Sequence, residues 1–219
     1  MKAEATQTDR HRRPSADAVR MTGLLGQRFG ASRRNRLLPH EDEFLLWPFR
    51  EHCPVGRNHP DRPHPEITRG DWQGEFMGTW IDSAVLTAWN GDDPELRAKV
   101  DGLVERWVAT QEPDGYLGTY DERDRWESWD VWVQAHDMIG LLSYAAQSGN
   151  EAAAEAARRV ADRVLEDFGP GKRLLHTGPH GGMASSAILE PMVWLYWRTG
   201  DDRYLELSLI HISEPTRRS

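Results

Sequence analysis

The stretch 130-DVWVQAHDMIGLLSYAAQSGNEAAAEAARRVADRVLED-167 predicts a hairpin of two helices. Its first half carries apolar residues at helical spacing on one face, namely Val131, Ala135, Met138, Ile139, Leu142 and Ala145. Gly149 is typical of a residue that ends a helix, and Asn150 is a favoured cap for the alanine-rich second half. The pattern therefore predicts two helices joined by a tight turn, with Phe168-Gly169 closing the second.

Similar hairpins are predicted before and after this one. The earlier pair covers 74–90 and a second helix that Asp93 caps, with Pro94 at its first position. A third pair begins near Ser186 and turns at Gly200. The three turns, at 91–92, 149–150 and 200–201, are 58 and 51 residues apart. Such a repeat predicts an all-α fold of stacked αα-hairpins, either an open solenoid or a closed α/α barrel.

Two long loops favour the barrel. Gln111 to Trp129 and Gly169 to Met183 each join one hairpin to the next, so we expect both at the same end of the stack. Both contain polar and aromatic residues, and binding sites are usually built where long loops gather. Before the hairpins, residues 1–20 are expected to be a disordered tail. Residues 21–70 contain six prolines, which predicts an irregular N-terminal arm.

The composition excludes several classes of protein. The 219 residues carry a net charge of -8, and residues 71–206 alone carry 25 acidic against 12 basic side chains. This disfavours a nucleic-acid partner, because binding to phosphates needs clustered Lys and Arg. The sequence contains no run of 18 apolar residues, so no membrane span and no membrane partner are expected. No apolar segment follows the basic N-terminus, which argues against a signal peptide, and we expect a cytoplasmic protein. The single cysteine, Cys53, excludes an internal disulfide.

Four motifs in collinear order resemble the β-L-arabinofuranosidase-type glycoside hydrolases, a family 127-like pattern. They are WQGEFMGTW (72–80), QEPDGYLGTY (111–120), DVWVQAHDMIGLLSY (130–144) and GMASSAILEPMVWLYWRTGDDRYL (182–205). The resemblance implies an (α/α)6 barrel followed by β-sandwich domains, and hydrolysis of plant-type glycosides. Six hairpins make such a barrel and about two and a half are predicted here, so residues 71–206 are expected to form an incomplete catalytic barrel.

The end of the chain departs from the family pattern. Residues 207–217, LSLIHISEPTR, follow Glu206 and look like the translation of a sequencing adapter. We therefore expect 207–219 to be a non-native tail. The alternative, which the sequence also permits, is an ordinary C-terminal segment with a stop at Pro215. An incomplete barrel would expose the apolar edge of its last hairpin, which predicts self-association.

No catalytic residue is predicted in this chain. In the related enzymes a cysteine in a zinc cluster is the nucleophile and a glutamate is the acid/base. Cys53 lies in the proline-rich arm, outside any such motif, and is expected to be an incidental thiol. The resemblance thus implies zinc only in a complete parent enzyme, and no metal or other cofactor is expected in this stretch.

The first hairpins are predicted to form the side of the barrel that binds the substrate, its substrate-binding wall. His136 lies where some relatives have a histidine that contacts the sugar, although a histidine satisfied within the bundle would fit the same pattern. Ser185 aligns near a second such histidine, so that this contact would be lost or replaced. Asp114 could hold two sugar hydroxyls and Tyr116 could stack on the ring, but Pro-Asp-Gly is also a plain turn.

The starts of two inner helices supply the remaining candidates. Trp72 and Glu75 enter the first, where a carboxylate is also favoured by the helix dipole without any ligand. Asp130 and Trp132 open the next inner helix in the same manner. The predicted function is the N-terminal part of a glycoside hydrolase with a carbohydrate substrate, itself inactive. The alternative is an α-helical interaction module, in which tryptophan and tyrosine mark protein contacts.

Overall fold

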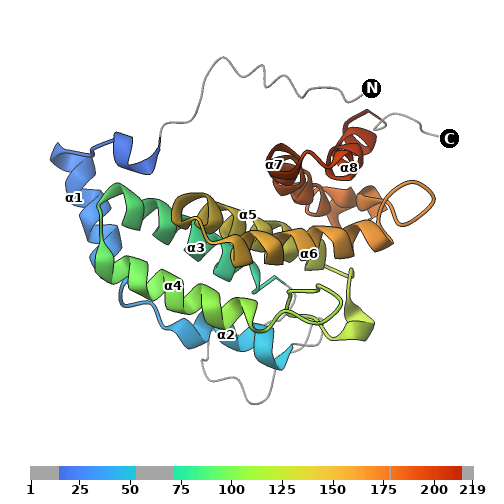
Figure 1. The fold of residues 1–219 in the computed structure, drawn as a ribbon. Helices are drawn as coiled ribbons and strands as arrows, with labels where there is room; N and C mark the ends of the chain where they lie inside the picture. The colour runs from blue at the N-terminus through green and yellow to red at the C-terminus, as the bar shows by residue number, and fades with distance from the viewer. Residues whose placement is uncertain (1–14, 53–71, 178, 214–219) are drawn as a thin grey trace.

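In the computed structural model, the described residues are 15–52, 72–177 and 179–213, and they form eight α-helices and no β-strand (Figure 1). The all-α prediction is therefore confirmed over this part of the chain. The helices are α1 Gly23–Ser32, α2 Asp42–Glu51, α3 Glu75–Asn90, α4 Pro94–Val108, α5 Asp130–Ser148, α6 Glu151–Asp167, α7 Leu189–Thr199 and α8 Asp202–Ser213.

The three predicted hairpins are confirmed as α3–α4, α5–α6 and α7–α8, and their caps explain the boundaries. Asp93 Oδ1 accepts a hydrogen bond from the Leu96 amide at 3.2 Å, at the start of α4. Asn150 Oδ1 accepts one from the Ala153 amide at 3.0 Å, at the start of α6. Gly149 and Gly200 end α5 and α7 in the left-handed conformation, which costs glycine little.

The inner helices α3 and α5 run parallel and meet backbone to backbone. Gly78 of α3 lies against the carbonyl group of His136, and a side-chain carbon there would overlap it. A side-chain carbon at Gly140 of α5 would in turn lie 2.7 Å from the carbonyl oxygen of Gly78. Two glycines thus allow this close approach, and the apolar stripes of both helices are buried beside it.

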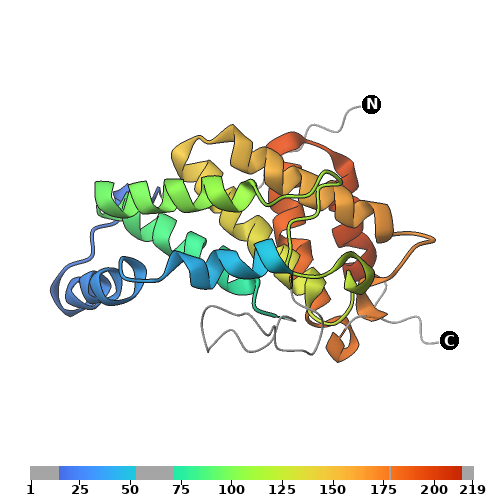
Figure 2. The ribbon, with the colours of Figure 1, turned by 90° about the horizontal axis from the view of Figure 1, so that it is seen from below.

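The two long loops lie at one end of the stack, as predicted, at the right of Figure 1. Trp126 in the first loop donates from its indole nitrogen to Asp167 at the end of α6, at 2.6 Å. Its ring meets that of Phe168 edge to face, with centroids 5.4 Å apart. After the second loop, a 3-10 turn at Ser185–Ile188 leads into α7 and packs against α5. Figure 2 shows α4 and α6 beside each other on the outer side of the inner helices.

The prediction of an irregular arm over 21–70 is wrong for its first half. Residues 23–37 are helical, and α2 continues through Pro48, which lacks the amide that the helix interior uses. Burial of Leu45, Leu46 and Phe49 against the hairpins compensates for that loss, since each buried side chain contributes about 1.5–3 kcal/mol. Residues 53–70, with Cys53, lie outside the described part.

The two predicted tails also differ from the expectation where they are described. Ala16–Ala18 form a 3-10 turn, and Asn90 at the end of α3 donates to the Ala16 carbonyl at 2.6 Å. Residues 1–14 are not described. At the other end, α8 continues past Glu206, and Leu207 is buried in the core. The foreign origin of 207–219 stays a prediction, which sequencing of an independent clone across Glu206 would test.

Candidate functional site

Four half-buried side chains gather where α3 and α5 begin: Glu75, Trp129, Trp132 and His136, which we call the α3–α5 cluster. Glu75 Oε2 accepts a hydrogen bond from the Trp132 indole nitrogen. The rings of Trp129 and Trp132 meet edge to face, with centroids 5.8 Å apart. The His136 ring lies 4.4 Å from that of Trp132. The parallel direction of the two helices brings these side chains to one end of the stack.

The backbone fixes the tautomer of His136. Its Nδ1 lies 2.9 Å from the carbonyl oxygen of Trp132, one turn earlier in α5. Because a carbonyl oxygen only accepts, Nδ1 carries the proton, and Nε2 of the neutral ring is an acceptor. His136 can therefore accept a hydrogen bond from a hydroxyl group, and the Glu75 carboxylate beside Trp132 can accept another.

Tyr116 has no ring face open to a sugar. The side chain is fully buried, and the Arg125 guanidinium lies 4.0 Å from the centre of its ring. Its hydroxyl donates to Asp130 Oδ1 at 2.8 Å and accepts from the Tyr120 amide at 3.1 Å. The predicted stacking on a sugar does not fit this placement, because the loop folds inward and uses the ring as core.

Asp114 is 42% exposed, and its carboxylate ties the loop together. Its Oδ1 accepts a hydrogen bond from the Tyr116 amide at 3.0 Å. This contact forms a turn at Pro-Asp-Gly, which was the alternative to a sugar-binding role. Its Oδ2 pairs with Arg125 at 2.7 Å and with Arg163 of α6 at 3.3 Å. Burial favours a higher pKa of Asp114, but the amide and the two arginines hold that pKa below its ordinary value.

Asp130 is buried below the α3–α5 cluster and does not face solvent. Burial raises the pKa of Asp130 to about 6, while hydrogen bonds from the Trp126 amide at 2.8 Å and from Tyr116 oppose that rise. The carboxylate therefore ties the loop to the start of α5, where Trp129 is the residue before the helix and Trp132 lies in its first turn. Its predicted role as a sugar ligand does not fit its burial, and it positions the two tryptophans.

Replacement of Tyr116 by phenylalanine tests this support. We expect the free energy of unfolding to fall by about 1–2 kcal/mol, because the buried Asp130 carboxylate and the Tyr120 amide each lose a partner. Urea unfolding followed by circular dichroism would measure it. Tyr196→Phe in α7, at a half-exposed ring, is the control, and an equal loss in both variants would contradict the assignment.

Trp72 and Ser185 differ in their exposure to solvent. Trp72 is exposed just before α3, and its carbonyl accepts from the Glu75 amide at 3.1 Å. It therefore lies next to the α3–α5 cluster in the chain. Ser185 is buried in the 3-10 turn before α7. The structure thus keeps Glu75, Trp132 and His136 together as candidates and buries Ser185.

Asp137 is a buried residue that the sequence motifs do not single out. Asp137 follows His136, is fully buried against Gly78, and has two carboxylate oxygens without a side-chain hydrogen bond among the described residues. Burial raises the pKa of Asp137 well above its ordinary value, and the nearby Asp130 adds to this rise. The spacing of Asp130, Gln134 and Asp137 was the available signal, because it places three polar side chains on one face of a helix with apolar neighbours.

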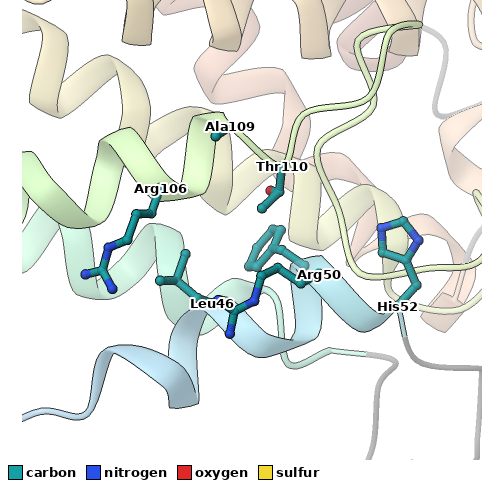
Figure 3. A pocket seen from close by; sticks show the side chains of 7 residues that line it. Leu46, Arg50, His52, Arg106, Ala109 and Thr110 are labelled. Atoms are coloured by element: carbon teal, nitrogen blue, oxygen red, sulfur yellow. The ribbon is translucent and has the colours of Figure 1, made fainter.

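A cavity of about 500 Å³ lies elsewhere, between α2 and the end of α4. Figure 3 shows Arg50, Arg106 and His52 around it, with Leu46 and Thr110. Each of these basic side chains already lies beside a carboxylate, namely Arg50 by Glu43, Arg106 by Asp42 and His52 by Glu112. None of the predicted site residues lines this cavity, so it is separate from the α3–α5 cluster.

The described residues do not fit the zinc site that the resemblance implies for a complete enzyme. Among them, no three His, Cys, Asp or Glu side chains are grouped so that they could hold a metal ion. Cys53 is outside the described part.

None of the helices in the described ranges has the length and apolar character needed to cross a membrane.

Comparison with known proteins gives a consistent result. The family model of the β-L-arabinofuranosidase GH127 catalytic domain matches residues 18–216. A non-reducing end β-L-arabinofuranosidase of Bifidobacterium longum subsp. longum is 29% identical over 164 residues, which are 65% of this chain and 24% of that protein.

Two solved structures share the fold. A GH127 β-L-arabinofuranosidase from Geobacillus stearothermophilus T6 superposes with a TM-score of 0.63 at 21% identity, over 87% of this chain and 31% of that one. A second GH127 β-arabinofuranosidase gives 0.65 at 20% identity, over 89% and 32%. The stacked hairpins are thus consistent with part of an α/α barrel, and the chain spans about a third of each solved structure.

Proposed function

This chain belongs to the family of the β-L-arabinofuranosidase GH127 catalytic domain, and from that premise we propose that it binds β-L-arabinofuranosides or related plant-type glycosides. The α3–α5 cluster is the observation that carries the proposal. It combines two tryptophan rings with a histidine and a carboxylate, all half-buried at one end of the hairpin stack.

The chemistry of the cluster suits a small sugar. The exposed parts of the Trp129 and Trp132 rings, which pack on each other and, for Trp132, on His136, would offer apolar area to the C–H side of a furanose ring. The His136 Nε2 and the Glu75 carboxylate are acceptors for its hydroxyl groups. Selectivity for a hydroxylated ring would follow, since these acceptors lose partners when a hydroxyl is missing.

The proposed role of this polypeptide is to hold substrate without cleaving it. Glycoside hydrolysis normally needs two carboxyl groups, or another nucleophile with an acid/base partner, across the scissile bond. In the family that the sequence resembles, the cysteine nucleophile and the acid/base glutamate belong to motifs that no stretch of this chain matches. We assign no catalytic residue, and a chromogenic aryl arabinofuranoside should show no turnover. Turnover above background would overturn this part of the proposal.

Replacement of His136 by alanine tests binding. Isothermal titration with methyl β-L-arabinofuranoside should show the dissociation constant rising about tenfold, which corresponds to about 1.4 kcal/mol for one lost hydrogen bond. His176→Ala, at an exposed ring in the second long loop, is the control and should bind like the original chain. Equal affinity of the His136 variant, or no binding by the original chain, would refute the proposed site.

A further inference from the structure

Arg125 is a buried cation in the first long loop, residues 111–129, with its side chain only 7% exposed. Its guanidinium group pairs with the carboxylate of Glu112 and, at 2.7 Å, with that of Asp114. The same group lies 4.0 Å from the centre of the Tyr116 ring. Arg125 therefore connects the second half of the loop with three residues of the first half.

The chemistry of a guanidinium group suits these three contacts. A planar guanidinium can contact an aromatic ring while its N–H groups donate to two carboxylates. A lysine ammonium group is a compact point charge and does not span the three partners in the same way. Both carboxylates, of Glu112 and Asp114, are partly exposed, so a small cation from solvent could reach them if the arginine side chain were removed.

The backbone between Arg125 and the α3–α5 cluster is strained. Trp126 and Ser128 have φ angles of 68° and 48°, in the left-handed region that residues other than glycine rarely adopt. Such conformations persist only where the surrounding contacts hold them. Trp129 of the α3–α5 cluster is the next residue, so the position of its ring depends on how firmly this segment is held.

Two tyrosines connect Arg125 to the cluster. The hydroxyl of Tyr116, whose ring Arg125 contacts, donates to Asp130 at the start of α5 and accepts from the Tyr120 amide. The Tyr120 hydroxyl in turn accepts a hydrogen bond from the Trp129 amide at 3.2 Å. A displacement of Tyr116 would therefore reach both the start of α5 and Trp129.

We propose that Arg125 is a positioning residue of the sugar site, which holds the two halves of the loop together and thereby fixes Trp129 and the start of α5. This role rests on the proposed sugar binding at the α3–α5 cluster. Arg125 is not a member of that cluster and acts through Tyr116, Asp130 and the strained segment.

Replacement of Arg125 by alanine tests the role with two measurements. In NMR spectra recorded without sugar, the indole N–H signals of Trp126 and Trp129 should move, while that of Trp107, buried in α4, should stay in place. The dissociation constant for methyl β-L-arabinofuranoside should rise about fivefold, because a displaced contact surface binds less well. Arg125→Lys should raise it about threefold, since the ammonium group keeps the charge but not the geometry.

Arg123→Ala is the matched control in the same loop. The Arg123 side chain is 73% exposed and lies beside its chain neighbours Asp121 and Asp124. Its removal takes away one arginine without touching the contacts between the two halves of the loop. The indole signals and the dissociation constant should therefore equal those of the original chain.

Added guanidinium separates positioning from a general loss of stability. About 0.1 M guanidinium chloride, far below the molar concentrations that unfold proteins, should return the Trp126 and Trp129 signals of Arg125→Ala to their original positions. It should also bring the dissociation constant within about twofold of the original value, because the ion would occupy the place between Glu112, Asp114 and the Tyr116 ring. Sodium chloride at the same concentration should restore neither.

Unchanged indole signals and affinity in Arg125→Ala would overturn the proposal, as would a loss that sodium chloride restores equally well. If circular dichroism showed that Arg125→Ala does not fold, Arg125→Lys would decide, and signals and affinity equal to those of the original chain would refute the role. Failure of the original chain to bind the sugar would instead refute the proposed function. The indole signals recorded without sugar would then still show whether Arg125 positions Trp129.

Discussion

Alanine at Gly78 is expected to lower the free energy of unfolding by about 3 kcal/mol, the upper range for overpacking in a filled core. The added methyl group would overlap the carbonyl group of His136 and approach the Asp137 amide at 2.7 Å. Backbone atoms cannot turn aside as a flexible side chain can. The two inner helices would have to separate, and the apolar contacts along them would loosen.

The matched control is Gly102→Ala in α4. No atom lies within 4 Å of the position that its methyl group would take, so only helix propensity acts there. We expect Gly102→Ala to stabilise the chain by about 0.5–1 kcal/mol. Urea unfolding of both variants would measure the difference. A Gly78 variant as stable as the original chain would show that α3 and α5 do not meet at this glycine.

Asparagine at Asp137 is expected to stabilise the chain by about 2–4 kcal/mol near pH 8, because an ionised carboxylate is costly to bury and the nearby Gly78 amide offsets only part of that cost. The folded chain raises the pKa of Asp137 well above the ordinary value of 3.8. Protonation therefore favours folding. The stability contributed by the protonated group is complete below pH 3.8 and is lost as the pH rises through the folded pKa.

The gain from Asp137→Asn should accordingly be small near pH 3.5 and grow with pH. Asp130, with a pKa of about 6, loses stability in the same direction in both proteins. Because its charge also raises the pKa of Asp137, the gain from Asp137→Asn should grow further as Asp130 ionises above about pH 6. Asp92→Asn, at a side chain that is 89% exposed, is the control and should change stability by less than about 1 kcal/mol at every pH. A gain that does not depend on pH would contradict a buried carboxylate that is costly to ionise.

The hairpins could be predicted because their signals are local. Apolar spacing, the caps Asp93 and Asn150, and the closing glycines all lie within a few residues of the boundaries that they set. The helices in the first half of the N-terminal arm, residues 21–52, could not be predicted, because the density of prolines indicated an irregular chain. Burial of Leu45, Leu46 and Phe49 against the hairpins outweighed Pro48, and only the packed structure shows that burial.

The candidate site was predicted in part for the same reason. Glu75, Trp132 and His136 lie on helices whose faces follow from the sequence, and the parallel packing of α3 and α5 brings them together. Tyr116 and Asp114 lie in a loop, where the sequence does not determine which side chains turn inward. Their contacts with Arg125 join residues from both halves of that loop and make it part of the core.

The binding of a sugar at the α3–α5 cluster is the central claim, and the indole N–H signals of Trp129 and Trp132 in an NMR titration test it most directly. Methyl β-L-arabinofuranoside should shift both signals in a saturable way, while the Trp107 signal, from a fully buried ring, should stay in place. The His136→Ala variant should need about tenfold more ligand for the same shift. Unchanged Trp129 and Trp132 signals at saturating ligand, or shifts spread equally over all tryptophans, would contradict the account.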